Sequence, residues 1–169
     1  MKAMIFAAGL GTRLKPLTDT LPKALVPING KPLLEHVILK LKAEGFTELI
    51  INLHHFASQI VDFLASKDNF GLKIAISDET AQLLETGGGI KKASWFFGNE
   101  PFLIHNVDIL SNLHLGDLMR YHNAQPNAAA TLVVSKRDTA RYLLFDATMQ
   151  MKGWTNIQTK EVKSPYPDT

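Results

Sequence analysis

The strongest constraint on the fold is a short apolar run near the start of the chain, Ala3-Met4-Ile5-Phe6-Ala7, which carries no charge and is followed by Gly9. A short uncharged run bounded by glycine is typical of a β-strand that is buried on both faces, as strands are in parallel sheets. Further apolar runs alternate along the chain with segments of helical periodicity. The sequence therefore predicts an α/β fold with a mostly parallel central sheet.

The remaining elements follow from the same two periodicities. Further strands are predicted at residues 48–53, 72–76, 101–107, 128–135 and 142–145. Helices are predicted at residues 31–45, 57–66, 90–97 and 117–124. Because ligands of such sheets bind outside the carboxyl ends of the strands, we expect the functional residues to follow strands directly.

Composition narrows the class of protein. With 169 residues, of which 46% are hydrophobic and 20% charged, the chain suits one globular domain. A net charge of +2 with scattered basic residues argues against nucleic acid as a partner. The absence of cysteine excludes disulfides and thiolate metal sites. No apolar run approaches the roughly 18 residues of a membrane helix, and Met1 leads directly into the first strand, so a cytoplasmic enzyme is expected.

The segment after the first strand, Ala8-Gly9-Leu10-Gly11-Thr12-Arg13, suits a ligand with several phosphates. Small residues let backbone N–H groups approach a ligand, and the guanidinium of Arg13 presents a rigid fork of donors. Lys23 adds a second cation directly after Pro22. These features indicate a polyphosphate site, and the alternative is an ordinary glycine-containing turn.

Two common phosphate loops do not match this segment. A Walker A loop requires a Gly-Lys pair followed by Ser or Thr, but Gly30-Lys31 is followed by Pro32. A dinucleotide-binding fingerprint requires a third glycine where this chain has Leu14. A dinucleotide-dependent oxidoreductase is therefore disfavoured.

The run FAAGLGTRLKPLT from Phe6 to Thr18, followed by Pro22-Lys23 and Lys31-Pro32, resembles the opening motif of the sugar-1-phosphate nucleotidyltransferases, or nucleotide-diphosphosugar pyrophosphorylases. The run ETGGGI from Glu85 to Ile90 resembles the branch with mannose-1-phosphate guanylyltransferases and N-acetylmuramate-1-phosphate uridylyltransferases. The resemblance implies a Rossmann-like three-layer sandwich of the glycosyltransferase-A type. It also implies a Mg²⁺-dependent transfer of a nucleotidyl group from a nucleoside triphosphate to a sugar 1-phosphate, with release of pyrophosphate.

The resemblance assigns roles by motif position. Arg13 would hold the departing pyrophosphate, Lys23 the α-phosphate region and Asp108 the Mg²⁺, which makes these three the candidate catalytic residues. Arg13 and Lys23 also count among the candidate nucleotide-binding residues. The others are Ala8, Gly9, Gly11, Thr12, Glu79, Thr86, Gly87 and Asn106.

Asp108 also stands out from the residues alone. It follows an apolar strand through Asn106-Val107, so its carboxylate is expected at the sheet edge, where Mg²⁺ bound to phosphates could meet it. The alternative is an Asx turn or a helix N-cap at the strand exit. Val107 departs from the family pattern, which often has glycine here.

The second glycine-rich segment, Thr86-Gly87-Gly88-Gly89, is expected to be a loop on which a base or ribose lies against bare backbone. The alternative is a simple strand-to-helix connection. Glu79 stands where family members place a base-reading side chain, and a carboxylate there slightly favours guanine over uracil. The alternative for Glu79 is a solvated loop residue.

The resemblance extends from Met1 to Phe145, and no later residue matches the sugar-binding region and second metal-binding aspartate of the family. The chain is therefore interpreted as truncated at its C-terminus. Residues 1–150 would form the nucleotide-binding core, and residues 151–169 an irregular segment, either disordered or the stub of a sugar-binding region.

The expected partners are a nucleoside triphosphate and a sugar 1-phosphate, with no nucleic acid and no membrane, and a homo-oligomer is compatible with the sequence. Because the sugar-binding part of the family pattern is missing, we expect nucleotide binding with little turnover. The alternative function is a non-catalytic nucleotide-binding regulatory module.

Overall fold

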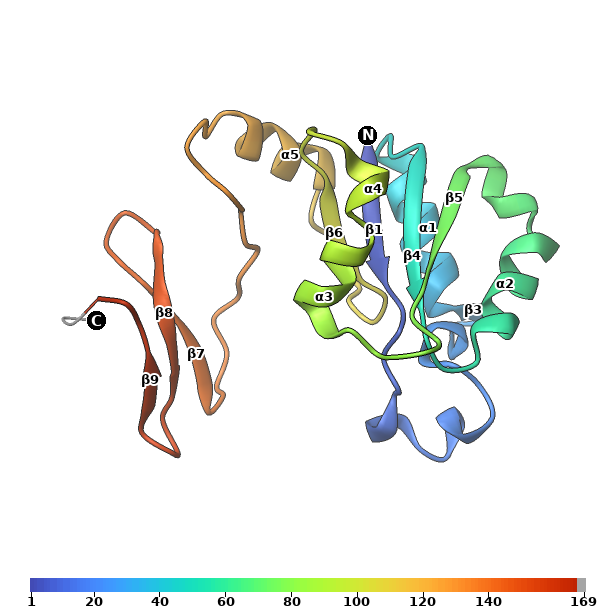
Figure 1. Cartoon of the computed structure of the whole chain (residues 1–169), viewed down its shortest axis with the longest axis horizontal. Helices are drawn as coiled ribbons and strands as arrows, with labels where there is room; N and C mark the ends of the chain where they lie inside the picture. The colour runs from blue at the N-terminus through green and yellow to red at the C-terminus, as the bar shows by residue number, and fades with distance from the viewer. Residues whose placement is uncertain (167–169) are drawn as a thin grey trace. The chain divides into compact units, whose positions relative to one another are not determined.

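The computed structural model describes residues 1–166 and contains two compact units. One unit comprises residues 1–131, and the other begins at Leu132 (Figure 1). The sequence predicts a boundary at residue 150 instead. The two differ because the strand at residues 141–145 pairs with the strand that follows it rather than with the parallel sheet.

The first unit contains the predicted parallel sheet. Its four strands are β1 (Lys2–Phe6), β4 (Glu48–Leu53), β5 (Lys73–Asp78) and β6 (Leu103–Asn106). Their order in the sheet is β5-β4-β1-β6, and every neighbouring pair is parallel. The α/β fold with a parallel central sheet, predicted from the apolar runs, is thus confirmed.

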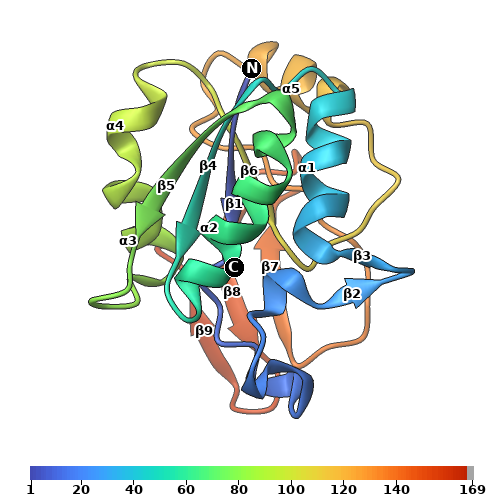
Figure 2. The same cartoon turned by 90° about the vertical axis from the view of Figure 1, so that its right-hand side faces the viewer.

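Helices cover both faces of this sheet (Figure 2). They are α1 (Leu33–Ala43), α2 (Ala57–Ser66), α3 (Glu85–Lys92), α4 (Ser94–Phe97) and α5 (Leu115–Asn123). Ala3 and Ile5 of β1 belong to a hydrophobic core with residues of α1, α2 and α5, whereas Met4 packs on the opposite face with Ala93 and Phe97. Because neighbouring strand residues point to opposite faces, a fully apolar strand requires this three-layer arrangement.

Short elements connect β1 to α1. They are the 3-10 helices η1 (Thr12–Leu14), η2 (Leu17–Asp19) and η3 (Lys23–Leu25) and the strands β2 (Pro27–Ile28) and β3 (Lys31–Pro32). Asn29 and Gly30 both have positive φ angles, of 50° and 78°, in the turn between β2 and β3. Asn-Gly is the preferred pair for such a hairpin turn. Another 3-10 helix, η4 (Asp68–Gly71), lies between α2 and β5.

The prediction of a glycine-rich loop at residues 86–89 is wrong, because α3 begins at Glu85 and includes all three glycines. Each glycine costs a helix about 1 kcal/mol relative to alanine, so the sequence favoured a loop. Gly89 is buried, and a Cβ atom there would lie 3.3 Å from the ring of Phe6. The close packing of α3 on the end of the sheet thus accounts for Gly89 inside the helix.

The second unit is a three-stranded antiparallel sheet in the order β7-β8-β9. Its strands are β7 (Arg141–Phe145), β8 (Met151–Asn156) and β9 (Glu161–Lys163). The prediction of an irregular segment after residue 150 is therefore wrong for β8 and β9. These strands were not predicted because their apolar content is low. Residues 167–169 of that predicted segment lie outside the described residues.

The predicted strand at residues 128–135 is not a strand in the structure. Leu132, Val133 and Val134 have the β-branched and apolar character of a strand, yet all three side chains are exposed. A strand requires a neighbour for its backbone N–H and C=O groups. These residues pair with no strand in the part of the chain that the structure describes.

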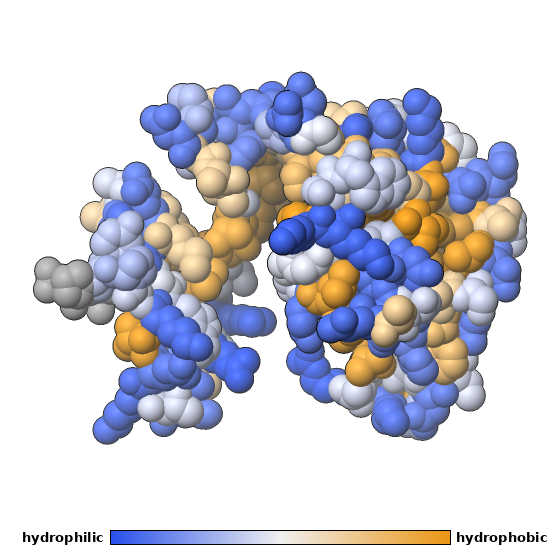
Figure 3. All heavy atoms as spheres, in the orientation of Figure 1, coloured by the Kyte–Doolittle hydropathy of each residue, from blue (hydrophilic) through white to orange (hydrophobic). Residues whose placement is uncertain are grey.

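The second unit has hydrogen-bonded strands but no buried residue among its described residues. Its exposed apolar side chains include Met149, Ile157 and Val162. On the face of this unit that Figure 3 shows, hydrophobic residues are set among hydrophilic ones. Every residue of the two hydrophobic cores belongs to the first unit.

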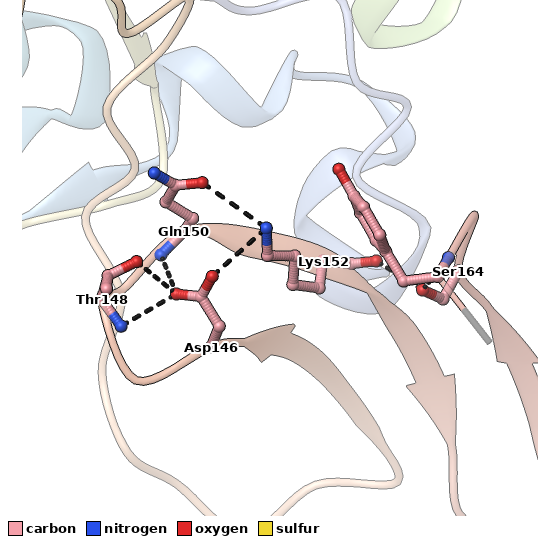
Figure 4. Close-up of polar contacts among 6 residues, drawn as sticks. Asp146, Thr148, Gln150, Lys152 and Ser164 are labelled. Carbon is pink, nitrogen blue, oxygen red and sulfur yellow. Dashed lines mark hydrogen bonds and ion pairs between the residues drawn. The ribbon is translucent and has the colours of Figure 1, made fainter. Parts of the chain in front are cut away.

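The turn between β7 and β8 is held by Asp146 (Figure 4). Asp146 Oδ1 accepts hydrogen bonds from Thr148 Oγ1 at 2.7 Å and from the backbone nitrogens of Thr148 and Gln150, each at 2.9 Å. Asp146 Oδ2 lies 3.2 Å from Lys152 Nζ. These contacts, led by the hydroxyl of Thr148, lower the pKa of Asp146 to about 2.

Candidate functional site

The candidate site is built on the carboxyl ends of the parallel strands. The sheet register aligns Asn106, Phe6, Asn52 and Ser77 across the four strands, one from each. The segments that follow these residues therefore start side by side at one edge of the sheet. That edge is where parallel α/β sheets bind ligands.

The opening segment leaves β1 through Ala7 and Ala8, which are both buried. Asn52 Oδ1 accepts hydrogen bonds from the backbone nitrogens of Ala7 at 2.8 Å and Ala8 at 3.4 Å. Gly9 is exposed, and a Cβ atom there would meet no atom within 4 Å. The backbone at Gly9 is thus exposed and is not covered by any side chain of residues 1–166.

Gly11 is the position at which this segment requires glycine. Its φ is +66°, and a Cβ atom would lie 2.9 Å from Thr18 Cγ2 and 3.1 Å from Lys23 Cβ. Its carbonyl oxygen accepts hydrogen bonds from Leu14 N at 2.8 Å and Thr18 Oγ1 at 2.9 Å. Thr12 and Arg13 follow in η1 with exposed side chains, and the Arg13 guanidinium has no hydrogen bond or ion pair within residues 1–166.

Lys23 and Asp108 form an ion pair, Lys23 Nζ with Asp108 Oδ2. The exposed fractions of the two side chains are 19% and 40%. Asp108 reaches this position because Val107 is buried and donates its backbone N–H to Phe6 O at 3.1 Å, which continues the pairing of β6 with β1. The structure therefore brings two of the three candidate catalytic residues together, and Val107 does not prevent the turn.

Asp108 forms neither the Asx turn nor the helix N-cap that were the alternatives to a metal ligand. Its carboxylate pairs with the Lys23 side chain rather than with a nearby backbone N–H. Asn106 is exposed at the end of β6, and its backbone carbonyl accepts hydrogen bonds from Ile109 N at 3.2 Å and His105 Nδ1 at 2.7 Å. Burial lowers the pKa of His105, which the Asn106 carbonyl partly opposes.

Glu79 has neither of the environments predicted from the sequence, because its side chain is completely buried. Its Oε1 accepts a hydrogen bond from Asn52 Nδ2 at 3.0 Å, and its Oε2 accepts one from the backbone nitrogen of Leu84 at 3.1 Å. A carboxyl group enclosed in this way does not present its oxygens to a base. Asn52 was not predicted, and a polar residue at the end of the apolar run LIIN was the available signal.

Thr86 and Gly87 are exposed in the first turn of α3 rather than in a loop. A Cβ atom at Gly87 would meet no atom within 4 Å, so the backbone is open there. The first turn of a helix carries N–H groups without intrahelical partners, which suit a polar or anionic group. Both residues are thus accessible at the start of a helix, whereas the sequence predicts a loop.

Residues 1–166 contain no group of three or more His, Cys, Asp or Glu side chains that could hold a metal ion by itself. They also contain no helix that is both long and apolar enough to cross a membrane.

The chain is similar to several known proteins. Residues 2–147 match the family model described as "Nucleotidyl transferase". The chain is 48% identical over 113 residues to an N-acetylmuramate alpha-1-phosphate uridylyltransferase of Neisseria meningitidis serogroup B, covering 67% of this chain and 49% of that protein. It is 31% identical over 168 residues to a probable mannose-1-phosphate guanylyltransferase of Oryza sativa subsp. japonica, covering 98% of this chain and 45% of that protein.

A similar solved structure is that of a putative glucose-1-phosphate thymidylyltransferase from Bacillus anthracis in complex with a sucrose. It superposes with a TM-score of 0.77 at 25% identity, covering 98% of this chain and 68% of that one. The chain spans about half the length of the two curated relatives described above.

Proposed function

Because the chain belongs to the nucleotidyl transferase family, we propose that its site binds a nucleoside triphosphate for transfer of the nucleotidyl group to a sugar 1-phosphate. In this reaction an oxygen of the sugar phosphate attacks the α-phosphorus, the bond from that phosphorus to the bridging oxygen breaks, and pyrophosphate leaves. Such transfers depend on positioning and on stabilisation of negative charge rather than on covalent catalysis.

The observation that carries this proposal is the ion pair of Lys23 with Asp108 next to the opening segment, where a Cβ atom at Gly11 would lie 3.1 Å from Lys23 Cβ. Lys23 is proposed to contact the α-phosphate once it leaves Asp108. Arg13 is proposed to hold the departing pyrophosphate, since its guanidinium is exposed and unpaired within residues 1–166. Ala8, Gly9, Gly11 and Thr12 shape the phosphate-facing backbone, whereas Thr86, Gly87 and Asn106 are proposed to contact the nucleoside.

The residues present fit Mg²⁺ bound together with a substrate. Magnesium in phosphate-transfer sites is commonly held by one or two carboxylates, substrate phosphate oxygens and water. Asp108 supplies one partly exposed carboxylate. When bound, the ion would neutralise charge on the phosphates, and Asp108 would hold it. Exchange of the Asp108–Lys23 pair for Asp108–Mg²⁺ would also leave Lys23 available to phosphate.

For the substrates, we propose uridylyl transfer to an amino-sugar 1-phosphate ahead of guanylyl transfer to mannose 1-phosphate. The 48% identity to an N-acetylmuramate alpha-1-phosphate uridylyltransferase supports this order. The burial of Glu79 supports it as well, because it removes the contact that favoured guanine. We further propose that these 169 residues bind nucleotide with little turnover, since they span about half the length of that relative.

The test measures binding of UTP, GTP, dTTP and CTP with Mg²⁺ by calorimetry, and pyrophosphate release with N-acetylmuramate 1-phosphate or mannose 1-phosphate. We expect UTP to bind best and pyrophosphate release to be slow. Binding of none of the four triphosphates would overturn the proposal. Binding that is insensitive to Lys23→Ala and Asp108→Ala, without release, would instead support a non-catalytic nucleotide-binding module.

A further inference from the structure

Asn52 and Glu79 lie between two segments of the proposed nucleotide site. On one side, Asn52 Oδ1 accepts hydrogen bonds from Ala7 N at 2.8 Å and Ala8 N at 3.4 Å. On the other side, Glu79 Oε2 accepts a hydrogen bond from Leu84 N at 3.1 Å, directly before α3. The two side chains are joined by Asn52 Nδ2, which donates to Glu79 Oε1 at 3.0 Å. A continuous chain of hydrogen bonds thus connects the opening segment to the start of α3.

Glu79 is itself held in place by its backbone. Its N–H donates to Leu53 O at 2.7 Å, and its carbonyl oxygen accepts hydrogen bonds from His54 Nδ1 at 2.7 Å and Gln82 N at 3.0 Å. The position of its carboxyl group is therefore set by β4 and by the turn after β5. Glu79 can act as an anchor because it is not free to follow the segments that it holds.

Both side chains are buried, with exposed fractions of 2% for Asn52 and 0% for Glu79. A buried polar group that loses its partner suffers the full cost of its desolvation, which exceeds the net gain of forming the hydrogen bond. Each side chain therefore depends on the other, and coupling between members of such a network is strong.

The packing of α3 is an independent observation that concerns the same pair, because the helix contacts Asn52 and Glu79 at Gly89. A Cβ atom at Gly89 would lie 2.9 Å from Glu79 Oε1 and 3.3 Å from Asn52 Nδ2. The helix thus rests directly on the hydrogen bond between the two side chains. Only glycine lets α3 approach the two side chains so closely, which explains why Gly89 occurs in the helix although glycine is unfavourable there.

From these contacts we propose that Asn52 and Glu79 are positioning residues for the nucleotide site. Through Ala7 and Ala8 they orient the backbone that precedes Gly9, and through Leu84 they orient the first turn of α3, which carries Thr86 and Gly87. The inference rests on the proposed function for the identity of the ligand. The physical link itself, from Glu79 through Asn52 to Ala8, exists in the free protein and can be measured there.

The direction of the hydrogen bonds allows a specific rescue experiment. In Asn52→Asp, two carboxylates face each other. In Glu79→Gln, an NH2 group replaces one of the two carboxylate oxygens and therefore faces either the donor Asn52 Nδ2 or the donor Leu84 N. In the double variant every bond is restored with the central one reversed, because Gln at 79 donates to Asp at 52 while each keeps an oxygen for its backbone partners.

Two measurements are made on each variant: amide hydrogen exchange at Ala7, Ala8 and Leu84 in the free protein, and the Kd for UTP with Mg²⁺. We expect each single variant to raise exchange at Ala8 and the Kd by about tenfold, a size typical of coupling within one hydrogen-bond network. The double variant should return both to within about threefold of the parent. The control is Glu35→Gln, a buried carboxyl group paired with Lys67 Nζ at 3.4 Å, which should change neither measurement.

The proposal is overturned if Glu79→Gln leaves exchange at Ala8 unchanged, because Glu79 does not touch Ala8 and acts only through Asn52. It is also overturned if the double variant binds no better than the single ones. Where a single variant does not fold, the double variant decides: a folded protein with parental Kd supports the link, and an unfolded or non-binding one contradicts it. Absence of UTP binding by the parent would contradict the proposed function alone. Amide exchange at Ala8 in the variants would then decide whether Asn52 and Glu79 position the backbone.

Discussion

Lys23 and Asp108, which are 85 residues apart in the sequence, form an ion pair at the carboxyl edge of the parallel sheet. Lys23 comes from η3, and Asp108 comes from the turn after β6. In the proposed function one binds phosphate and the other binds Mg²⁺. The free protein therefore holds its cation and its carboxylate against each other, and the ligand would have to separate them.

This pairing makes the effect of Asp108→Asn depend on the metal. Without Mg²⁺, loss of the carboxylate frees Lys23 for phosphate, and UTP should bind about twofold to fivefold more tightly, as expected from a partly exposed ion pair. With Mg²⁺, the parent should gain affinity, whereas the variant should not. Calorimetry with EDTA or with Mg²⁺ separates the two effects.

The matched control for this experiment is Asp19→Asn. Asp19 Oδ1 lies 3.2 Å from Lys15 Nζ, and both side chains are well exposed. This substitution removes the same charge without freeing Lys23, so the response to Mg²⁺ should stay parental. An equal response to Mg²⁺ in the parent and in Asp108→Asn would contradict the metal role of Asp108.

Gly11→Ala should destabilise the first unit by about 2–4 kcal/mol, from a left-handed backbone and overpacking together. Its φ is +66°, and the new Cβ atom would lie 2.9 Å from Thr18 Cγ2. Gly30→Ala is the control, since φ is +78° there but no atom lies within 4 Å. It should cost only the backbone term of about 1–2 kcal/mol. Urea unfolding of both variants measures the difference, and equal losses would show that Thr18 yields without cost.

His105 should make the first unit less stable in mild acid. Burial is the main cause that lowers the pKa of His105 below its usual 6.5, so the folded state favours the neutral ring. The stabilising contribution is then fully present above pH 6.5 and is lost as the pH falls toward the lowered pKa. His105→Gln should flatten the decrease in urea midpoint between pH 7 and pH 5. The exposed His55→Gln is the control and should keep the decrease, whereas an unchanged slope in His105→Gln would contradict the assignment.

We expect the turn between β7 and β8 in the second unit to lose its hydrogen bonds in strong acid, because they depend on the charged form of Asp146. The hydroxyl of Thr148 and the backbone nitrogens of Gln150 and Thr148 favour its charged form and lower its pKa from 3.8 to about 2. The stabilisation is therefore complete above about pH 4 and disappears as the pH falls through 2. The amides of Thr148 and Gln150 should lose protection from hydrogen exchange in this range. Asp146→Asn should lose it already at pH 5, whereas Asp138→Asn should not, and early loss in both variants would refute the assignment.

Much of the first unit follows from local sequence. The uncharged run Ala3–Ala7 and the run at residues 48–53 predict buried parallel strands, and the apolar spacing at residues 57–66 predicts α2 without error. These elements can be predicted from the sequence because burial requires apolar residues at a regular spacing within a few residues of one another. The strands β8 and β9 leave no such pattern, since antiparallel pairing between short polar segments is decided by the partner strand.

The candidate site divides in the same way. The sequence alone determined which residues are candidates for phosphate binding near Gly9, because small residues and the cations Arg13 and Lys23 favour phosphate wherever they lie. Only the tertiary structure decided that Lys23 meets Asp108 and that Glu79 is buried against Asn52. The reason is that strand register and helix packing determine which distant residues become neighbours. Asp108 and Glu79 both carry a carboxylate, but Asp108 is partly exposed at the sheet edge whereas Glu79 is buried and accepts hydrogen bonds from the protein.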